Sequence, residues 1–252
     1  MPVVSSDIEV WGSEGEPVND AQSSGGNIQH DAHATGGIIV TFTDIAALDN
    51  VEILSDGADT RVLTLTGRLS TGAIAVENLN LNGTNVVTSA NQYERILRAV
   101  VNVKDAARTV TVRRATGDTL IGTIGINCKA FHRRFYDAAS DPSSQKIRYE
   151  LVYLRNKHAT LALSNARVKL TSDPALKVRI GVATAKGNVA AVANRLAAPG
   201  GVSFVDDNVE AAVPTGILGP GEYIGVWCEL TLAAGDSPFK NTFTVQALGS
   251  TA

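Results

Sequence analysis

The chain has 252 residues, of which 44% are hydrophobic and 19% are charged, a composition typical of a soluble globular protein with one large or two ordinary domains. The formal net charge of -3 provides no electrostatic attraction to nucleic acid or to an anionic membrane, so we expect neither as a partner. The sequence has no run of about 18 uninterrupted apolar residues, the length that a membrane-spanning helix needs.

Residues 1–36 differ in composition from the rest of the chain. They are rich in Gly, Ser, Asn and Gln, which offer few groups for packing, and they predict an extended N-terminal arm. Two interpretations stay open: a loosely packed terminus, or a segment that becomes ordered on a neighbouring subunit. Ile8, Val10 and Trp11 give the arm one apolar anchor. Acidic residues such as Glu9 stand where a secretory signal needs positive charge, so we expect synthesis in the cytoplasm.

From Gly37 onward, apolar and polar residues alternate in short runs, which is the pattern of half-buried strands. The runs lie at residues 37–43, 61–66, 73–81, 100–103, 109–112 and 119–126. Asn82-Gly83 predicts a tight hairpin turn, because both residues tolerate positive φ. The triplet Asn82-Gly83-Thr84 is also a glycosylation sequon, which we interpret as a turn only. Residues 37–128 are therefore predicted to form a first β-sandwich domain.

Residues 91–100 are the one segment for which the sequence also allows a short helix. Apolar residues from Tyr93 to Val100 recur at helical spacing, and Asn91 with Glu94 resembles a capping pair. The segment is short, and alternation resumes at once after it. Helix and strand both stay open here.

A change of composition at residues 129–144 predicts a linker between two domains. The segment begins with a basic and aromatic cluster that comprises Phe131, His132, Arg133, Arg134, Phe135 and Tyr136. Arginine beside aromatic side chains is typical of protein interfaces and of sites for single-stranded nucleic acid. Because the net charge is negative, we favour a protein interface, with packing between the two domains as the alternative.

Residues 145–252 are predicted to form a second β-sandwich domain. Strand-like runs lie at residues 147–153, 161–170, 178–182, 224–232 and 243–247. Strands at this spacing, with at most one helix in the chain, predict an all-β fold. We expect two antiparallel β-sandwich domains, immunoglobulin-like or jelly-roll, with an extended N-terminal arm.

No motif identifies a metal site. His30-Asp31-Ala32-His33 carries ligand types that zinc accepts, but the segment offers neither a fourth ligand nor a rigid platform. Asp206, Asp207 and Glu210 carry oxygen ligands suited to calcium without the spacing of a calcium loop, so we interpret them as solvated loop charges. We predict no metal and no cofactor.

No motif identifies a catalytic site either. His132 and His158 stand apart from any nucleophile and are predicted to be surface or turn residues. The serines form no Gly-x-Ser-x-Gly elbow, and the glycine-rich residues 216–221 introduce no helix that would hold a phosphate. Cys128 and Cys228 have the spacing of neither a disulfide framework nor a zinc site, so they are predicted to be buried thiols.

Two groups of short segments resemble β-domains of structural proteins in tailed bacteriophages. The first group comprises Val62–Arg68, Thr71–Ala73, Glu77–Thr84 and Tyr93–Leu97. The second comprises Tyr153–Leu163, Ala166–Val168, Val192–Asn194, Ala197–Pro199, Gly225–Trp227 and Phe243–Thr244. The resemblance covers most of residues 37–252 and consists of strand and turn residues, so it implies no catalytic residue.

The resemblance implies a non-enzymatic virion protein, made in the host cytoplasm, that decorates or stabilises the capsid exterior; a neck or tail component is the alternative. Its expected partners are the major capsid protein or neck and tail proteins, and we expect a homo-oligomer within a symmetric assembly. If the arm at residues 1–36 crosses a subunit boundary, its removal leaves folding cooperative but abolishes attachment.

Two other classes of function stay open. A carbohydrate-binding module or adhesin stacks exposed aromatic side chains on sugar rings, but only 5% of the residues are aromatic. A polysaccharide hydrolase needs two carboxylates held across a cleft, and no pattern singles out such a pair.

Overall fold

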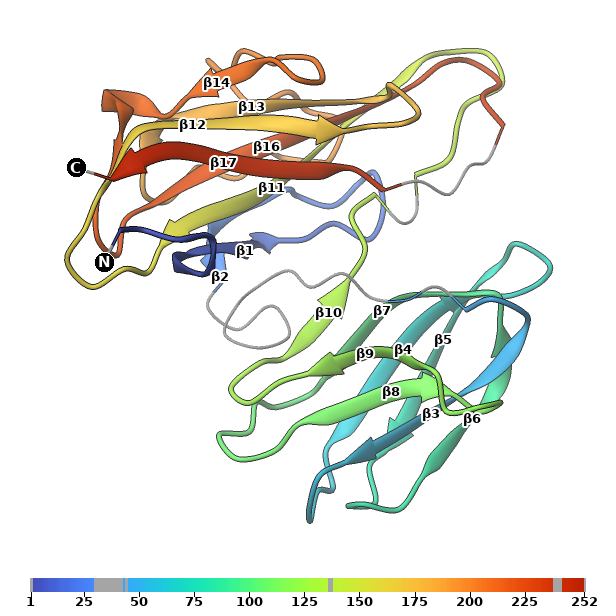
Figure 1. Cartoon of the computed structure of the whole chain (residues 1–252). Helices are drawn as coiled ribbons and strands as arrows, with labels where there is room; N and C mark the ends of the chain where they lie inside the picture. The colour runs from blue at the N-terminus through green and yellow to red at the C-terminus, as the bar shows by residue number, and fades with distance from the viewer. Residues whose placement is uncertain (1, 30–42, 44, 136–137, 238–241, 252) are drawn as a thin grey trace. The chain divides into compact units, whose positions relative to one another are not determined.

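The computed structural model describes residues 2–29, 43, 45–135, 138–237 and 242–251. Within these ranges the regular elements are strands apart from two short 3-10 helices, Ser5–Asp7 and Pro214–Gly216, so the predicted all-β fold is confirmed. None of the described helices is long and apolar enough to cross a membrane. The chain divides into two compact units (Figure 1). Unit 1 comprises Met1–Gln29 and Phe135–Ala252, and unit 2 comprises His30–Arg134.

The described residues of unit 2 form two antiparallel sheets of four strands each, with strand orders β10-β7-β4-β5 and β6-β3-β8-β9 (Figure 1). The strands are β3 (Asp49–Ser55), β4 (Val62–Arg68), β5 (Ile74–Asn80), β6 (Val87–Tyr93), β7 (Arg95–Val101), β8 (Val110–Arg114), β9 (Leu120–Ile124) and β10 (Ala130–His132). One apolar core holds side chains from both sheets, including Leu63 and Leu65 of β4 and Val51 and Ile53 of β3. Buried and half-buried residues alternate along β3, as the period of two in the sequence predicts.

Residues 91–100 form strands, so the helical alternative is wrong. The segment contains the end of β6 and most of β7. A register shift in the pairing of β4 with β7 falls at Gly67, whose partner is Ile96, and both Ile96 and Leu97 are buried. A bulge of this kind interrupts the alternation of a strand. The interrupted pattern therefore imitated helical spacing.

The turn predicted at Asn82-Gly83 is confirmed. Asn82 forms a bridge with Asn85, and Gly83 has a φ of 60°. Of the strand predicted at residues 37–43, only Thr43 lies within the described part of the chain. Its N–H donates to the carbonyl of Ile121, at 2.9 Å.

The part of unit 1 that the structure describes forms a five-stranded sheet with the order β13-β16-β11-β1-β2 and a second sheet around β12 (Figure 1). The strands are β1 (Ile8–Gly15), β2 (Gly25–Gln29), β11 (Lys146–Asn156), β12 (Leu163–Ser172), β13 (Val178–Lys186), β14 (Glu210–Ala212), β15 (Ile217–Leu218), β16 (Tyr223–Leu232) and β17 (Thr244–Thr251). β17 pairs with one side of β12, while β14 and β15 pair with the other. β11 and β16 are buried along most of their length, so both of their faces are covered.

The N-terminal segment is a pair of strands in unit 1, not an extended arm. β1 pairs with β11 from Ile8 opposite Asn156 to Trp11 opposite Tyr153, and β2 pairs with β1. Trp11 packs in an apolar cluster that also contains residues of β2, β11 and β16. Residues 8–29 therefore belong to the domain that we predicted to begin at residue 145. Residues 30–36 of the predicted arm lie outside the described residues.

The glycines of this segment are needed for close packing. A Cβ on Gly15 would lie 2.7 Å from the carbonyl oxygen of Gly25. A Cβ on Gly25 would lie 2.6 Å from the ring of Trp227, and Gly25 has a φ of 88° that favours glycine. We interpreted these glycines as a sign of loose packing, but Gly15 and Gly25 are needed because other atoms approach their backbone closely.

Residues 129–144 are not a separate linker. β10 belongs to unit 2, and the division between the units falls between Arg134 and Phe135. Phe131 is buried in the core of unit 2, while the ring of Phe135 is buried in unit 1 at 6.5 Å from the ring of Phe243. The interface interpretation therefore fails for both phenylalanines. Tyr136 lies outside the described residues.

Candidate functional site

The structure describes only some of the metal candidates of the sequence. His30, Asp31 and His33 lie outside the described residues. In the part of the chain that the structure describes, no three His, Cys, Asp or Glu side chains are grouped to hold a metal ion. Glu210 instead pairs with Arg167, at 2.7 Å. Asp207 accepts a hydrogen bond from the side chain of the adjacent Asn208.

The structure describes the side chains of one of the two candidate histidines and of both cysteines. The Nδ1 atom of His158 accepts the N–H groups of Thr160 and Leu161, at 3.2 and 3.0 Å, so His158 is a turn residue as predicted. Cys128 and Cys228 are buried and form no disulfide, which confirms the prediction of buried thiols. The side chain of His132 lies outside what the structure describes.

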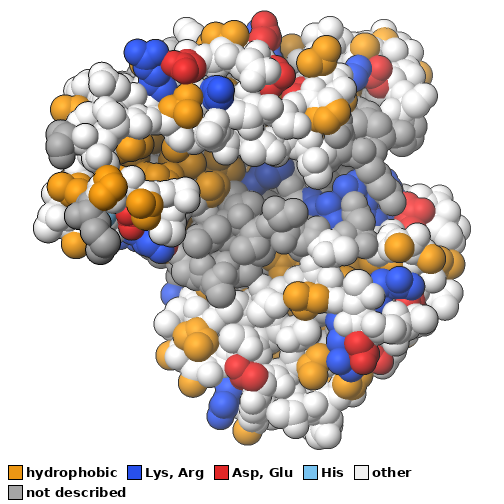
Figure 2. Space-filling view, in the orientation of Figure 1, with side chains coloured by type: hydrophobic (Ala, Val, Ile, Leu, Met, Phe, Trp, Pro, Cys, Tyr) orange, Lys and Arg blue, Asp and Glu red, His pale blue; other side chains and the backbone are white. Residues whose placement is uncertain are grey.

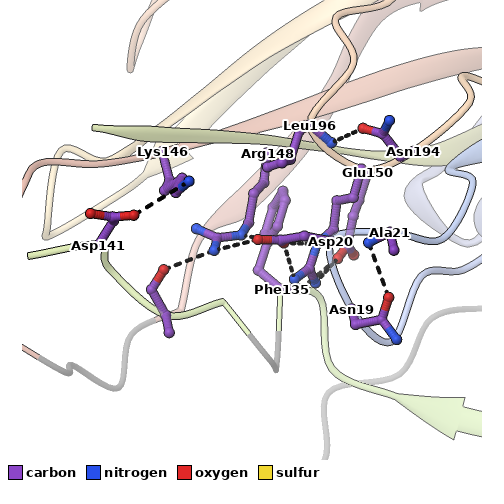
Figure 3. Close-up of polar contacts among 12 residues, drawn as sticks. Asn19, Asp20, Ala21, Phe135, Asp141, Lys146, Arg148, Glu150, Asn194 and Leu196 are labelled. Atoms are coloured by element: carbon purple, nitrogen blue, oxygen red, sulfur yellow. Dashed lines mark hydrogen bonds and ion pairs between the residues drawn. The ribbon is translucent and has the colours of Figure 1, made fainter. Parts of the chain in front are cut away.

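Four charged side chains form a cluster in unit 1 that the sequence did not indicate (Figure 3); three of them are buried, and the Asp20 side chain is 33% exposed. This Asp20 cluster consists of Asp20, Arg148, Glu150 and Arg195. Asp20 lies in the connection between β1 and β2, Arg148 and Glu150 lie on β11, and Arg195 lies in the loop after β13. Arg195 is 0% exposed and Glu150 is 1% exposed. Charges this deeply buried are normally paired, because their desolvation is costly.

Asp20 is the acceptor that joins the two arginines. Its Oδ1 accepts from Arg148 Nε at 2.7 Å and its Oδ2 accepts from Arg148 Nη2 at 2.8 Å, which makes a bidentate pair. Its Oδ1 also accepts from Arg195 Nη2 at 2.6 Å and from Arg195 Nε at 3.1 Å. One carboxylate thus fixes the β1–β2 connection to β11 and to the loop after β13.

Glu150 extends the cluster to the start of the C-terminal part of unit 1. Its Oε1 lies 3.5 Å from Arg195 Nη1 and accepts the N–H of Phe135 at 3.0 Å. The backbone is also tied here, because the N–H of Tyr149 donates to the carbonyl of Arg195 at 2.8 Å. The cluster contains two positive and two negative groups, so its charges balance.

The electrostatics keep Asp20 ionised. Burial by itself would raise the pKa of Asp20, but the hydrogen bonds and charges of Arg148 and Arg195 hold the pKa below its ordinary value. The Asp20 side chain is therefore a carboxylate that accepts hydrogen bonds from both arginines. The contacts span 128 and 175 positions in the sequence, so no local motif indicated them.

Unit 2 has a smaller polar site at Glu77. This residue of β5 accepts the N–H of Ala90 at 2.6 Å and that of Asn91 at 3.3 Å, both on β6 of the opposite sheet. The hydroxyl of Tyr93 donates to the same carboxylate, at 3.2 Å. Burial and the charge of Glu77 together raise the pKa of Tyr93 to about 12. Glu77 therefore ties two edge strands of the sandwich together.

A hollow of about 310 Å³ lies in unit 1, where the loop after β13 faces the end of that strand. The residues that line it are Ala183, Thr184, Ala185, Asn188, Val189, Ala190, Ala191, Val192, Pro199, Gly200, Val202 and Trp227. None of these residues is charged. We call this feature the alanine hollow.

Comparison with known proteins gives no family for this chain. No family model matches the sequence, and no curated protein matches it.

Proposed function

We propose that this chain is a non-enzymatic structural protein of a tailed-bacteriophage virion and that it attaches to the capsid exterior. The observation that carries the proposal is the construction of the chain from two all-β units. It agrees with the resemblance of the strand and turn segments to β-domains of such proteins. Under this proposal, the partner is the major capsid protein.

The edges of the large sheet in unit 1 support a role as a rigid building block. Ile180 of the outer strand β13 exchanges two backbone hydrogen bonds with Val205, at 3.1 and 2.8 Å. Next to the other outer strand, β2, Ser24 exchanges two with Val192, at 3.3 and 2.8 Å. Each bridge occupies one position at an edge of the sheet and so limits uncontrolled strand pairing between copies there, which a protein concentrated on a shell must avoid.

The surface charges are compatible with dense repetition. On the face shown in Figure 2, several Asp and Glu side chains lie beside Lys or Arg side chains. The ion pairs of unit 1 include Arg167 with Glu210 and Lys186 with Glu222, each at an N–O distance of 2.6 to 2.7 Å. Together with a net charge of -3, mixed charges keep long-range repulsion between copies small. On a symmetric shell, many weak contacts then add up.

The test is to mix the purified chain with virus particles that lack it and to image the particles by electron microscopy. Density at regular positions on the heads is the expected result. Density at one vertex or along a tail would replace the capsid proposal with a neck or tail role. No binding to any particle would overturn the virion proposal, and saturable binding on a glycan array would then favour a carbohydrate-binding module. A folded β protein of similar size serves as the control for non-specific adhesion.

The structure changes the result that we expect from deletion of residues 1–36. Removal of residues 1–36 takes away β1, β2 and Asp20, all of which belong to unit 1. We therefore expect loss of folded unit 1, instead of an intact protein that has only lost attachment. Attachment should be tested with surface substitutions in the full chain.

A further inference from the structure

The turn at Asn82-Gly83 carries a reactive pair of residues as well as a favourable backbone conformation. It is the only Asn-Gly pair in the sequence. In such a pair the backbone nitrogen of the glycine can attack the side-chain amide of the asparagine, because glycine has no side chain that blocks the approach. The side chain of Asn82 is exposed, so the neighbouring chain does not shield the amide. By its chemistry, Asn82 is therefore a candidate for spontaneous deamidation.

The fold holds the nitrogen that would make this attack. Asn82 forms a bridge with Asn85, and Gly83 follows Asn82 in the turn with a φ of 60° that favours glycine. The N–H of Gly83 donates to the carbonyl of Asp59 at 2.9 Å, and the carbonyl of Gly83 accepts the N–H of Ser55 at 2.9 Å. The peptide groups on both sides of Gly83 are thus bonded to a neighbouring segment of unit 2.

The Asp59 carbonyl is itself presented from a fixed position. Asp59 is buried, and its carboxylate accepts the backbone N–H of Arg61 at 3.0 Å and pairs with the Arg61 guanidinium at 2.6 Å. The carbonyl of Arg61 in turn accepts the N–H of Leu81 at 2.9 Å, next to the turn. Release of the Gly83 N–H therefore requires local opening of this region of unit 2.

The chemistry of deamidation needs that release. The Gly83 nitrogen first loses its proton and then attacks Cγ of Asn82. A bond forms between these two atoms, the bond from Cγ to the side-chain nitrogen breaks, and that nitrogen leaves as ammonia with a proton. Water then opens the resulting cyclic imide at either carbonyl, which gives aspartate or isoaspartate without any oxidation or reduction. In the closed turn the proton of the Gly83 nitrogen lies in the hydrogen bond to Asp59, so the reaction must wait until that bond breaks.

We propose that Asn82 is a deamidation site gated by its turn: the amide persists while the turn is closed and is converted to aspartate and isoaspartate when the turn opens. Isoaspartate adds a methylene group to the main chain between positions 82 and 83. Gly83 then cannot keep its contacts with both Asp59 and Ser55 in their present geometry, so the product favours the open turn. The modification is thus an irreversible record of local opening in unit 2. This inference goes beyond the virion proposal and does not depend on it.

The first test compares deamidation at position 82 in the folded full chain and in the chain kept unfolded by denaturant, both in mildly alkaline buffer. Mass spectrometry of proteolytic peptides measures the conversion of amide to acid. The folded chain should react about tenfold or more slowly. Equal rates in the two samples would overturn the proposal, as would an Asn82 that stays unmodified in denaturant. Asp56-Gly57 can isomerise through the same type of ring, but that reaction leaves the mass unchanged.

The second test uses variants of the full chain. Asp59→Ala removes the carboxylate that anchors the acceptor of the Gly83 N–H and should speed deamidation of the folded chain several-fold. Asp59→Asn keeps an acceptor oxygen and should have a smaller effect. The control Asp118→Ala removes a side chain of unit 2 that is 67% exposed and should leave the rate unchanged. Hydrogen exchange of peptides from β7 and β8 shows whether each variant stays folded.

Asn82→Gln identifies the reacting position. Its longer side chain closes a less favourable ring, so the mass increase in the peptide that contains residue 82 should disappear on the time scale of the experiment. A rate that is the same in folded Asp59→Ala, Asp118→Ala and wild type would refute the gating by the turn.

Discussion

The two units hold their strands together by different means. In unit 2, an apolar core lies between two sheets, and Glu77 ties one pair of edge strands together. In unit 1, the first 29 residues are attached to the sheet by strand pairing, by an apolar cluster and by the buried charges of the Asp20 cluster. Alternation in the sequence accounts for the first arrangement but not for the second. The difference indicates that unit 1 is the more sensitive to single polar substitutions.

Deletion of residues 1–29 should have the largest effect on stability, and it should unfold unit 1 while unit 2 stays folded. It removes β1 and β2 and leaves Arg148 and Arg195 without Asp20, so unit 1 should not fold. Unit 2 should keep its protection against hydrogen exchange. The chain has two tryptophans, Trp11 and Trp227, and both belong to unit 1, so the emission of Trp227 reports on unit 1 in the deletion variant.

Deletion of residues 1–4, which lie before β1, is the control and should preserve the emission of the native protein. If the chain without residues 1–29 kept a buried Trp227 and cooperative unfolding, the strand pair would not be needed by unit 1.

Asp20→Ala should have the next largest effect. It leaves two arginines that are almost fully buried without their shared acceptor, and we expect unit 1 to lose about 3 kcal/mol of stability. Denaturant unfolding followed by tryptophan fluorescence measures the loss.

The matched control is Glu210→Ala in unit 1, whose partner Arg167 lies at 2.7 Å and whose side chain, like that of Arg167, is exposed. It should change stability by less than about 0.5 kcal/mol. Equal losses of unfolding free energy in the two variants would show that burial of Arg148 and Arg195 does not make their contacts with Asp20 more important for stability than an exposed ion pair.

Glu77→Ala should destabilise unit 2 by about 2 kcal/mol, because it removes the acceptor of two backbone N–H groups and of the Tyr93 hydroxyl. Glu77→Gln keeps an acceptor oxygen and should have a smaller effect. Hydrogen exchange of peptides from β5 and β6 measures both. The exposed neighbour Asn80→Ala is the control, and an effect as large as that of Glu77→Ala would contradict the assigned role.

The smallest effect concerns acid stability. The pKa of Asp20 lies below its ordinary value, so the residue contributes stability that is present above about pH 4 and is lost as pH falls through the folded pKa. Asp20→Asn should therefore weaken the pH dependence of unit 1 stability in the acid range. The acid dependence of unit 2 should not change. An unchanged dependence of unit 1 stability on pH would mean that the two arginines do not lower the pKa of Asp20.

The sequence predicted the all-β fold, several strand positions and the turn at Asn82-Gly83, because these depend on alternation and on local backbone preferences. It left helix and strand both open at residues 91–100, where a bulge opposite Gly67 places Ile96 and Leu97 together in the interior. A bulge is a property of strand pairing, and its position is set by the partner strand.

The candidate sites were less predictable than the fold. Gly15 and Gly25 looked like signs of a loose terminus, yet they are required by the close approach of two backbones and a tryptophan ring. Asp20 and Arg195 meet across 175 positions. Each of these features is set by tertiary packing.

The most direct test of this account is hydrogen exchange of the intact chain, with peptides from residues 8–15 and 25–29 compared with peptides from β11. We expect the N-terminal peptides to be protected like those of β11. Asp20→Ala should reduce the protection of the N-terminal peptides more than that of peptides from unit 2. Exchange of residues 8–29 at the rate of an unstructured peptide would contradict it and would restore the extended arm.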